Sequence, residues 1–172
     1  MEDNNNPTDL YNVEQRFKRV FIKLKEVKTC KYNKKKIEEF ANHCLANGTG
    51  KNKVSRYLYD LIHIAVWLKK PFNEADKIDI ERIMRELESA KGEQTNKPFS
   101  EWTKRGFRVL IRKFYKWLRD KDTKDFPKEV DWICLKMKEC RKKLPEEMLT
   151  EEEVIKLIEN CNNIRDKALI AF

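Results

Sequence analysis

The stretch from Phe99 to Arg119, FSEWTKRGFRVLIRKFYKWLR, constrains the fold more than any other part of the sequence. On a helix at 100° per residue, its apolar residues occupy one broad side and a row of cations occupies the other. The apolar side comprises Phe99, Trp102, Gly106, Phe107, Val109, Leu110, Phe114, Trp117 and Leu118. The cationic stripe comprises Arg105, Arg108, Arg112, Lys116 and Arg119. An apolar side this wide predicts a long helix packed against several others.

The cationic stripe has two interpretations. It extends over about five turns of 5.4 Å, or roughly 27 Å, and it lacks the Glu to Lys pairs at i,i+4 that are typical of a solvated helix face. It could therefore bind a polyanion such as nucleic acid. It could also do no more than keep an amphipathic helix soluble, and the stripe alone leaves both interpretations open.

The composition predicts an all-α fold. A chain of 172 residues is long enough for one domain and part of a second. It has only 4 Gly and 5 Pro, and its apolar residues recur mostly at spacings of three and four. The five cysteines are odd in number and include no CxxC pair, so neither a disulfide framework nor a zinc site is indicated. We expect reduced thiols, no metal site and no cofactor.

Periodic apolar residues and capping signals divide the chain into five regions. Residues 1–9 are Asn-rich and acidic, and we expect a disordered tail. Residues 10–31 contain a predicted helix whose non-apolar faces carry Arg16, Arg19 and Lys23. Residues 32–126 predict a bundle of four to five helices, with helices at about 33–46 (N-cap Asn33), 52–69, 79–89 (N-cap Asp79) and 99–119.

The chain beyond residue 126 changes character twice. Residues 127–148 read as an extended basic linker. Residues 149–172 predict two further helices, the first with Thr150 as N-cap and Glu153 completing a capping box. Because the last residues are nearly all apolar, we expect the chain to be cut where another domain begins.

The distribution of charge indicates an anionic partner. The formal net charge is +9, made up of −3 over residues 1–12, +16 over residues 13–144 and −4 over residues 145–172. A basic block of this size attracts phosphate polyanions or anionic membranes. A membrane is the weaker choice because there is no long apolar run and no signal peptide, and the cations are shared by several helices. We therefore expect a cytoplasmic, nucleoid-associated protein.

Three phrases resemble a known family. They are SRYLYDLIHIAVWLKKPFNEADKIDIE (55–81), KPFSEWTKRGFRVLIRKFYKWL (97–118) and KKLPEEMLTEEEVIKLIENCNNIRDKALIAF (142–172). In this order they resemble the archaeal branch of the tyrosine recombinase, or phage integrase, family of site-specific DNA recombinases. The third phrase is the most specific, because it is similar to the junction that opens the family's catalytic domain.

The resemblance implies a SAM-like core-binding domain that clamps one face of duplex DNA. Its partners would be duplex DNA and further recombinase protomers, with no small-molecule substrate. The implied DNA contacts lie on the second helix, the fourth helix and the basic linker. They are Lys51, Lys53, Ser55, Arg56, Thr103, Lys104, Arg105, Arg108, Arg112, Lys136, Lys138, Arg141, Lys142 and Lys143. The cations near the start of the second helix also oppose its dipole, and a bound phosphate would resolve that conflict.

The chain departs from the family in its chemistry. Family members attack a phosphodiester with a tyrosine, and arginines, a lysine and histidines stabilise the phosphorane. The first arginine phrase and the tyrosine would lie beyond residue 172, so the resemblance implies DNA binding for recombination or integration without catalysis. By their periodicity, Tyr57, Tyr59 and Tyr115 lie on helices of the core-binding domain, and we do not interpret them as nucleophiles. The alternative is a regulator that binds DNA or a recombinase and blocks synapsis.

Overall fold

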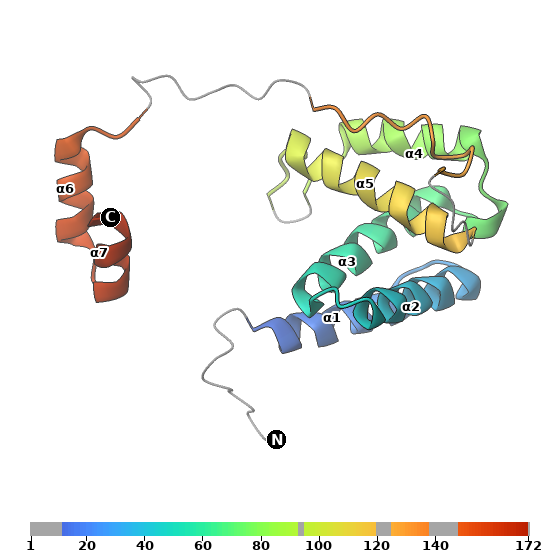
Figure 1. The fold of residues 1–172 in the computed structure, drawn as a ribbon, viewed down its shortest axis with the longest axis horizontal. Coiled ribbons are helices and arrows are strands. Elements are labelled where there is room, and N and C mark those ends of the chain that lie inside the picture. The colour runs from blue at the N-terminus through green and yellow to red at the C-terminus, as the bar shows by residue number, and fades with distance from the viewer. Residues whose placement is uncertain (1–11, 93–94, 120–124, 138–147, 172) are drawn as a thin grey trace. The chain divides into compact units, whose positions relative to one another are not determined.

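The computed structural model describes residues 12–92, 95–119, 125–137 and 148–171. Within these ranges it contains seven α-helices, one short 3-10 helix and no β-strand beyond an isolated bridge between Lys91 and Pro98. The expected all-α class is therefore confirmed. The chain divides into two units, Met1–Met137 and Lys138–Phe172, which are described separately below (Figure 1).

The first unit is built around one central helix. Helix α3 (Lys51–Leu68) packs against every other α-helix of this unit, as Figure 1 shows. These neighbours are α1 (Val13–Glu26), α2 (Lys31–Ala46), α4 (Lys77–Ser89) and α5 (Glu101–Leu118), and the short η1 (Phe72–Glu74) follows α3. A helix with partners on several sides needs apolar residues on several sides, and α3 buries Leu58, Leu61, Ile62 and Ile64 within two turns.

An aromatic cluster joins α2, η1 and α5. The Phe114 ring makes edge-to-face contacts with Phe40, at 5.2 Å between centroids, and with Phe72, at 4.8 Å. All three side chains are buried. Edge-to-face pairs add about 0.5–1.5 kcal/mol each to the burial of apolar area, so this cluster fixes the packing of α5 on the bundle.

The predicted N-cap at Asn33 is wrong. Helix α2 begins at Lys31, and Asn33 is a buried residue of its first turn. Its Oδ1 accepts a hydrogen bond from the backbone N–H of Phe72 at 2.8 Å, and its Nδ2 donates to the carbonyl of Lys70 at 3.0 Å. The Asn33 side chain does not cap its own helix because it satisfies the backbone N–H of Phe72 and the carbonyl of Lys70, which follow α3.

The predicted N-cap at Asp79 is also wrong, by three residues. Asp76 is the N-cap of α4, and its Oδ1 accepts a hydrogen bond from the Asp79 N–H at 3.0 Å. The Asp79 carboxylate in turn accepts from the Asp76 N–H at 3.1 Å. Asp79 is therefore the third helical residue of a capping box rather than its first member.

Helix α5 is turned relative to the predicted orientation. Phe107, Leu110 and Phe114 are buried as expected, but the buried face extends toward Lys104 and Tyr115. Trp102 is on the opposite side and is 66% exposed, so its predicted place on the apolar side is wrong. Lys104 is tolerated on the buried side because its ammonium pairs with the carboxylates of Glu88 and Glu101.

Residues 125–137 belong to the first unit and pack on its helices. Val130 and Ile133 are buried and belong to the same hydrophobic core as the helices. The sequence places these residues at the start of the basic linker, whereas the division between units falls after Met137. The rest of the expected linker up to residue 147 and the expected tail at 1–9 lie outside the described residues.

The second unit is a pair of short helices. Helices α6 (Glu151–Asn160) and α7 (Ile164–Ala171) pack against each other, and neither contains a buried residue. The predicted capping box is confirmed: Thr150 Oγ1 accepts from the Glu153 N–H at 3.3 Å, and Glu153 Oε2 accepts from the Thr150 N–H at 2.8 Å. An N-cap of this kind stabilises a helix by about 1 kcal/mol.

Candidate nucleic-acid interface

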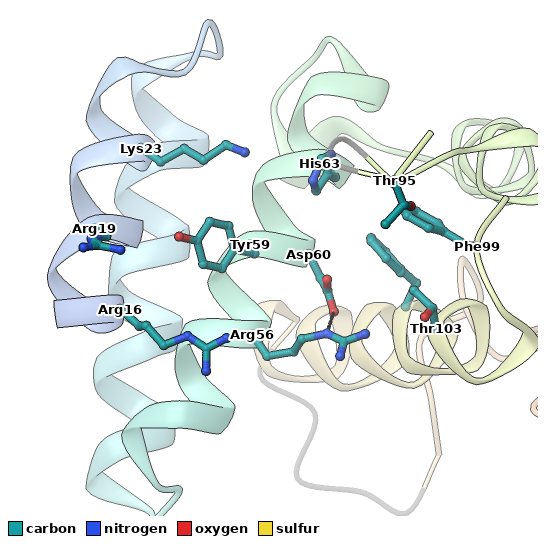
Figure 2. Close-up of a pocket in the computed structure, with 12 residues that line it drawn as sticks. Arg16, Arg19, Lys23, Arg56, Tyr59, Asp60, His63, Thr95, Phe99 and Thr103 are labelled. Atoms are coloured by element: carbon teal, nitrogen blue, oxygen red, sulfur yellow. Dashed lines mark hydrogen bonds and ion pairs between the residues drawn. The ribbon is translucent and has the colours of Figure 1, made fainter. Parts of the chain in front are cut away.

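A hollow on the first unit brings together side chains from α1, α3 and the start of α5 (Figure 2). Its volume is about 640 Å³. It is lined by Arg16, Arg19, Lys23, Arg56, Tyr59, Asp60, His63, Gly92, Thr95, Phe99, Thr103 and Phe107. We call this site the cationic hollow, because its lining contains four Arg or Lys residues and one carboxylate.

Helix α1 supplies three of the four cations. Arg16, Arg19 and Lys23 are spaced by three and four residues, which places them on one face of the helix. The neighbouring face is anchored, since Val20 and Leu24 are fully buried. The burial of these two side chains therefore holds the basic face of α1 toward the hollow.

Helix α3 supplies the fourth cation and the single carboxylate. Arg56 Nε donates to Asp60 Oδ2 at 3.4 Å, one helical turn away. The Arg56 side chain is 58% exposed, whereas that of Asp60 is 10% exposed. Burial raises the pKa of Asp60 to about 6, and the nearby Arg56 guanidinium opposes that rise. The acid is thus partly neutral near pH 6, and the hollow stays strongly positive.

The remaining wall is aromatic and hydroxylic. The Phe99 ring stacks on the buried Phe107 ring, with centroids 5.7 Å apart and planes inclined by 20°. Thr103 lies in the first turn of α5, where its N–H donates to the Oγ of the N-cap Ser100 at 3.2 Å. Figure 2 shows Thr95, Phe99 and Thr103 on the side of the hollow that faces the α1 cations.

The four residues predicted on α3 have different surroundings. Arg56 lines the hollow. Lys51 pairs with the Glu14 carboxylate of α1, and Lys53 Nζ lies 5.9 Å from the centroid of the Tyr57 ring. Ser55 is buried, and its hydroxyl donates to the Lys51 carbonyl at 2.9 Å, so its hydrogen bond is made within the helix and not to a ligand.

Two of the predicted α5 cations pair with carboxylates. Lys104 is buried, and its Nζ lies 2.8 Å from Glu88 Oε2 and 3.2 Å from Glu101 Oε1. The hydrogen bond to Glu88 is the main cause that raises the pKa of Lys104. Arg108 pairs with the other oxygen of Glu88, whose pKa is lowered mainly by the bond from Lys104. These cations hold α4 and α5 together.

Two further cations of the stripe bind residues 125–137. Arg105 Nε donates to the Leu135 carbonyl at 3.3 Å, and an Arg112 N–H donates to the Ile133 carbonyl at 3.5 Å. Among the α5 residues predicted to contact DNA, Thr103 alone lines the hollow. Lys136 is exposed. The predicted sites Lys138, Arg141, Lys142 and Lys143 lie outside the described residues.

Tyr115 is the most deeply placed of the tyrosines considered in the sequence. It is fully buried, and burial raises the pKa of its hydroxyl. A buried, protonated phenol cannot reach a phosphodiester. Tyr57 and Tyr59 are partly buried and pack against the core.

The α1 cations Arg16, Arg19 and Lys23 were not predicted from the sequence as DNA contacts. The signal that could have identified them is their shared spacing of three and four residues beside the apolar face that contains Val20 and Leu24. Residues 99–119 carry a longer basic stripe, in which Arg105, Arg108 and Arg112 have partners within the protein. Length of the stripe was a poor guide because it does not reveal which cations have internal partners.

A scan against protein-family models finds no match to this chain, and searches of curated proteins and of solved structures find no similar protein. Within the described ranges, no group of three or more His, Cys, Asp or Glu residues could hold a metal ion. None of the helices in those ranges is long and apolar enough to cross a lipid bilayer.

Proposed function

We propose that this chain binds duplex DNA as the core-binding part of a site-specific tyrosine recombinase, and that it does not cleave DNA by itself. The observation that carries the proposal is the cationic hollow, where Arg16, Arg19, Lys23 and Arg56 line one surface of the first unit. The resemblance of the three phrases at 55–81, 97–118 and 142–172 supplies the recombinase context.

The charge of the hollow suits a phosphate backbone. Double-stranded DNA carries one negative charge per about 1.7 Å of its axis, and cations that neutralise it release counterions. Arg16 and Arg19 are exposed, and the Arg56 side chain is more than half exposed. All three are therefore already at the surface, where they can contact phosphates. Backbone contacts of this kind fix the orientation of a protein on DNA.

The proposed contact surface differs from the stripe on α5. Lys104 and Arg108 have carboxylate partners, and Arg105 and Arg112 bind carbonyls of residues 133 and 135. We therefore assign the primary contacts to the cations of the hollow and to Thr103. The exposed Lys53 and Lys136 are additional contacts that a duplex could reach.

A salt titration tests the proposal. Fluorescence anisotropy with a labelled 30-base-pair duplex should give a slope of log K against log salt of about −4 to −6, if five or six phosphates are neutralised. A suicide substrate should give no covalent adduct. A slope near zero would contradict the DNA interface, and an adduct would contradict the absence of cleavage.

A regulator that binds a recombinase is the second candidate, and one observation favours it. In the second unit, Ile155, Leu157, Ile164 and Leu169 are exposed on two helices that bury no residue. An exposed apolar surface on a helical pair favours a protein partner. Size-exclusion chromatography with a full-length tyrosine recombinase would separate the candidates, because the regulator predicts co-elution in the absence of DNA.

A further inference from the structure

We propose that the cationic hollow binds a single unpaired nucleotide, with its phosphate at Arg16, Arg19 and Arg56 and its base against Tyr59 or Phe99, the aromatic rings that line different sides of the hollow. If the nucleotide belongs to a DNA strand, the inference rests on the proposed DNA binding. It then specifies the preferred DNA as a duplex with an unpaired nucleotide beside it. A free nucleoside phosphate offers the same chemistry.

The walls of the hollow have different chemistry. Arg16, Arg19 and Lys23 project from α1 on one side, and Phe99 and Thr103 lie on the other side (Figure 2). The α3 side chains Tyr59, Asp60 and His63 lie between them (Figure 2). A ligand that contacts all of these walls must carry negative charge at one end and a flat, apolar surface at the other.

A paired duplex does not meet this requirement. Its phosphates face outward, but the faces of its bases are stacked on each other and cannot contact aromatic side chains. An unpaired nucleotide exposes one phosphate and both faces of its base, and stacking of such bases on aromatic rings is a general mode of single-strand recognition. The aromatic wall therefore points to a nucleotide outside the duplex.

The aromatic wall is held in place by its own packing. Phe99 stacks on Phe107, and Phe107 in turn lies 5.7 Å from the Trp67 ring. On the opposite face of the hollow, the Lys23 ammonium lies 5.6 Å from the centroid of the Tyr59 ring. A base that stacks on Tyr59 or Phe99 would thus meet side chains whose positions are already fixed, which lowers the entropy cost of binding.

The dimensions and the polar groups agree with this ligand. A volume of about 640 Å³ falls within the range of about 300–1,000 Å³ that is usual for small-molecule sites. The Thr103 hydroxyl and the Asp60 carboxylate line the same space and can bond to the edge of a base. The lining of the hollow thus combines positive charge, aromatic surface and hydrogen-bonding groups.

The test compares three labelled DNAs with the wild-type chain at one salt concentration. They are a blunt duplex, the same duplex with a three-nucleotide overhang, and the overhang duplex with abasic sites replacing the three bases. We expect about tenfold tighter binding to the overhang duplex than to the blunt duplex, and loss of that gain with the abasic sites. Equal affinity for all three would overturn the inference and leave the proposed duplex binding intact.

Two variants locate the effect in the hollow. Tyr59→Leu and Phe99→Leu should each remove most of the tenfold gain while binding to the blunt duplex stays unchanged. Trp132→Leu removes an aromatic ring outside the hollow and should keep the gain. If both hollow variants fold, as circular dichroism would show, and both keep the gain, the assignment to Tyr59 and Phe99 is wrong.

Competition with deoxyadenosine monophosphate distinguishes the two sources of the ligand. If the monophosphate displaces the overhang duplex but not the blunt duplex, the free nucleotide is sufficient for binding. If it displaces neither duplex while the overhang duplex still binds about tenfold more tightly, the nucleotide is recognised as part of a strand. A third outcome is that the monophosphate binds directly, Tyr59→Leu abolishes this binding, and no DNA binds. This outcome would support the hollow as a nucleotide site and refute the proposed function.

Discussion

The guanidinium carbon of Arg112 lies 3.9 Å from the centroid of the Phe126 ring. The same guanidinium donates to the carbonyl of Ile133, so one side chain of α5 holds two points of the segment 125–137 against the bundle. A cation over an aromatic ring stabilises a protein by about 0.5–2 kcal/mol, depending on its desolvation. An arginine that looks like part of a DNA-binding stripe thus has a structural role.

Replacing this arginine should lower stability. We expect Arg112→Gln to reduce the free energy of unfolding by about 1–2 kcal/mol, because the ring contact and the bond to Ile133 are both lost. Urea denaturation followed by circular dichroism measures the change. Lys128→Gln, an exposed cation of the same segment, is the control and should change stability by less than about 0.5 kcal/mol. Equal effects of the two substitutions would contradict the role of Arg112.

The buried amide of Asn33 gives a second prediction. Asn33→Ala should destabilise the first unit by about 1–3 kcal/mol, because the Phe72 N–H and the Lys70 carbonyl lose their partner. Asn42→Ala, at an exposed position of the same helix, controls for helix propensity and should be neutral or slightly stabilising. Thermal denaturation of both variants checks this, and an Asn33→Ala protein as stable as the Asn42→Ala protein would refute it.

Asp60 predicts an unusual dependence of stability on pH. Its pKa is about 6 in the folded protein against 3.8 for an ordinary aspartate, so the folded state binds this proton more tightly than the unfolded chain. Its contribution to stability is therefore full below about pH 4, and it is lost as the pH rises through about 6. The total loss is on the order of 3 kcal/mol.

The substitution Asp60→Asn tests this account. The variant should be more stable than the wild type at pH 7.5, and the advantage should shrink as the pH falls toward 5. Urea denaturation between pH 5 and pH 8 measures the difference, with the exposed Asp131→Asn as control. A difference between Asp60→Asn and the wild type that does not vary with pH would show that Asp60 titrates as an ordinary surface carboxylate.

The helices could be predicted from the sequence because their apolar residues repeat at helical spacing. Ile37, Phe40 and Cys44 on α2 and Ile80, Ile83 and Leu87 on α4 are buried as that spacing requires. Helix starts were less accurate where a polar side chain has a distant partner. Asn33 bonds to residues 70 and 72, and no local pattern reveals such a contact.

The candidate site was predicted only in part, for the same reason. Of the residues predicted to contact DNA, Arg56 and Thr103 line the hollow. Lys104 and Arg108 instead pair with Glu88, which is 16 and 20 residues earlier in the chain. A helical wheel shows the direction of a cation but not the carboxylate that a neighbouring helix places beside it.

Charge reversal in the hollow tests the central claim most directly. The variant Arg16→Glu, Arg19→Glu, Arg56→Glu is compared with the control Lys18→Glu, Lys25→Glu, Arg85→Glu, which changes the net charge equally at exposed positions outside the hollow. Salt-titrated anisotropy with the 30-base-pair duplex should show at least a hundredfold weaker binding and a slope shallower by about 2 to 3 for the hollow variant. The control should keep the wild-type slope, and both variants should remain helical. Equal loss in both would mean that net charge alone attracts DNA, and wild-type binding by a folded hollow variant would contradict the proposed interface.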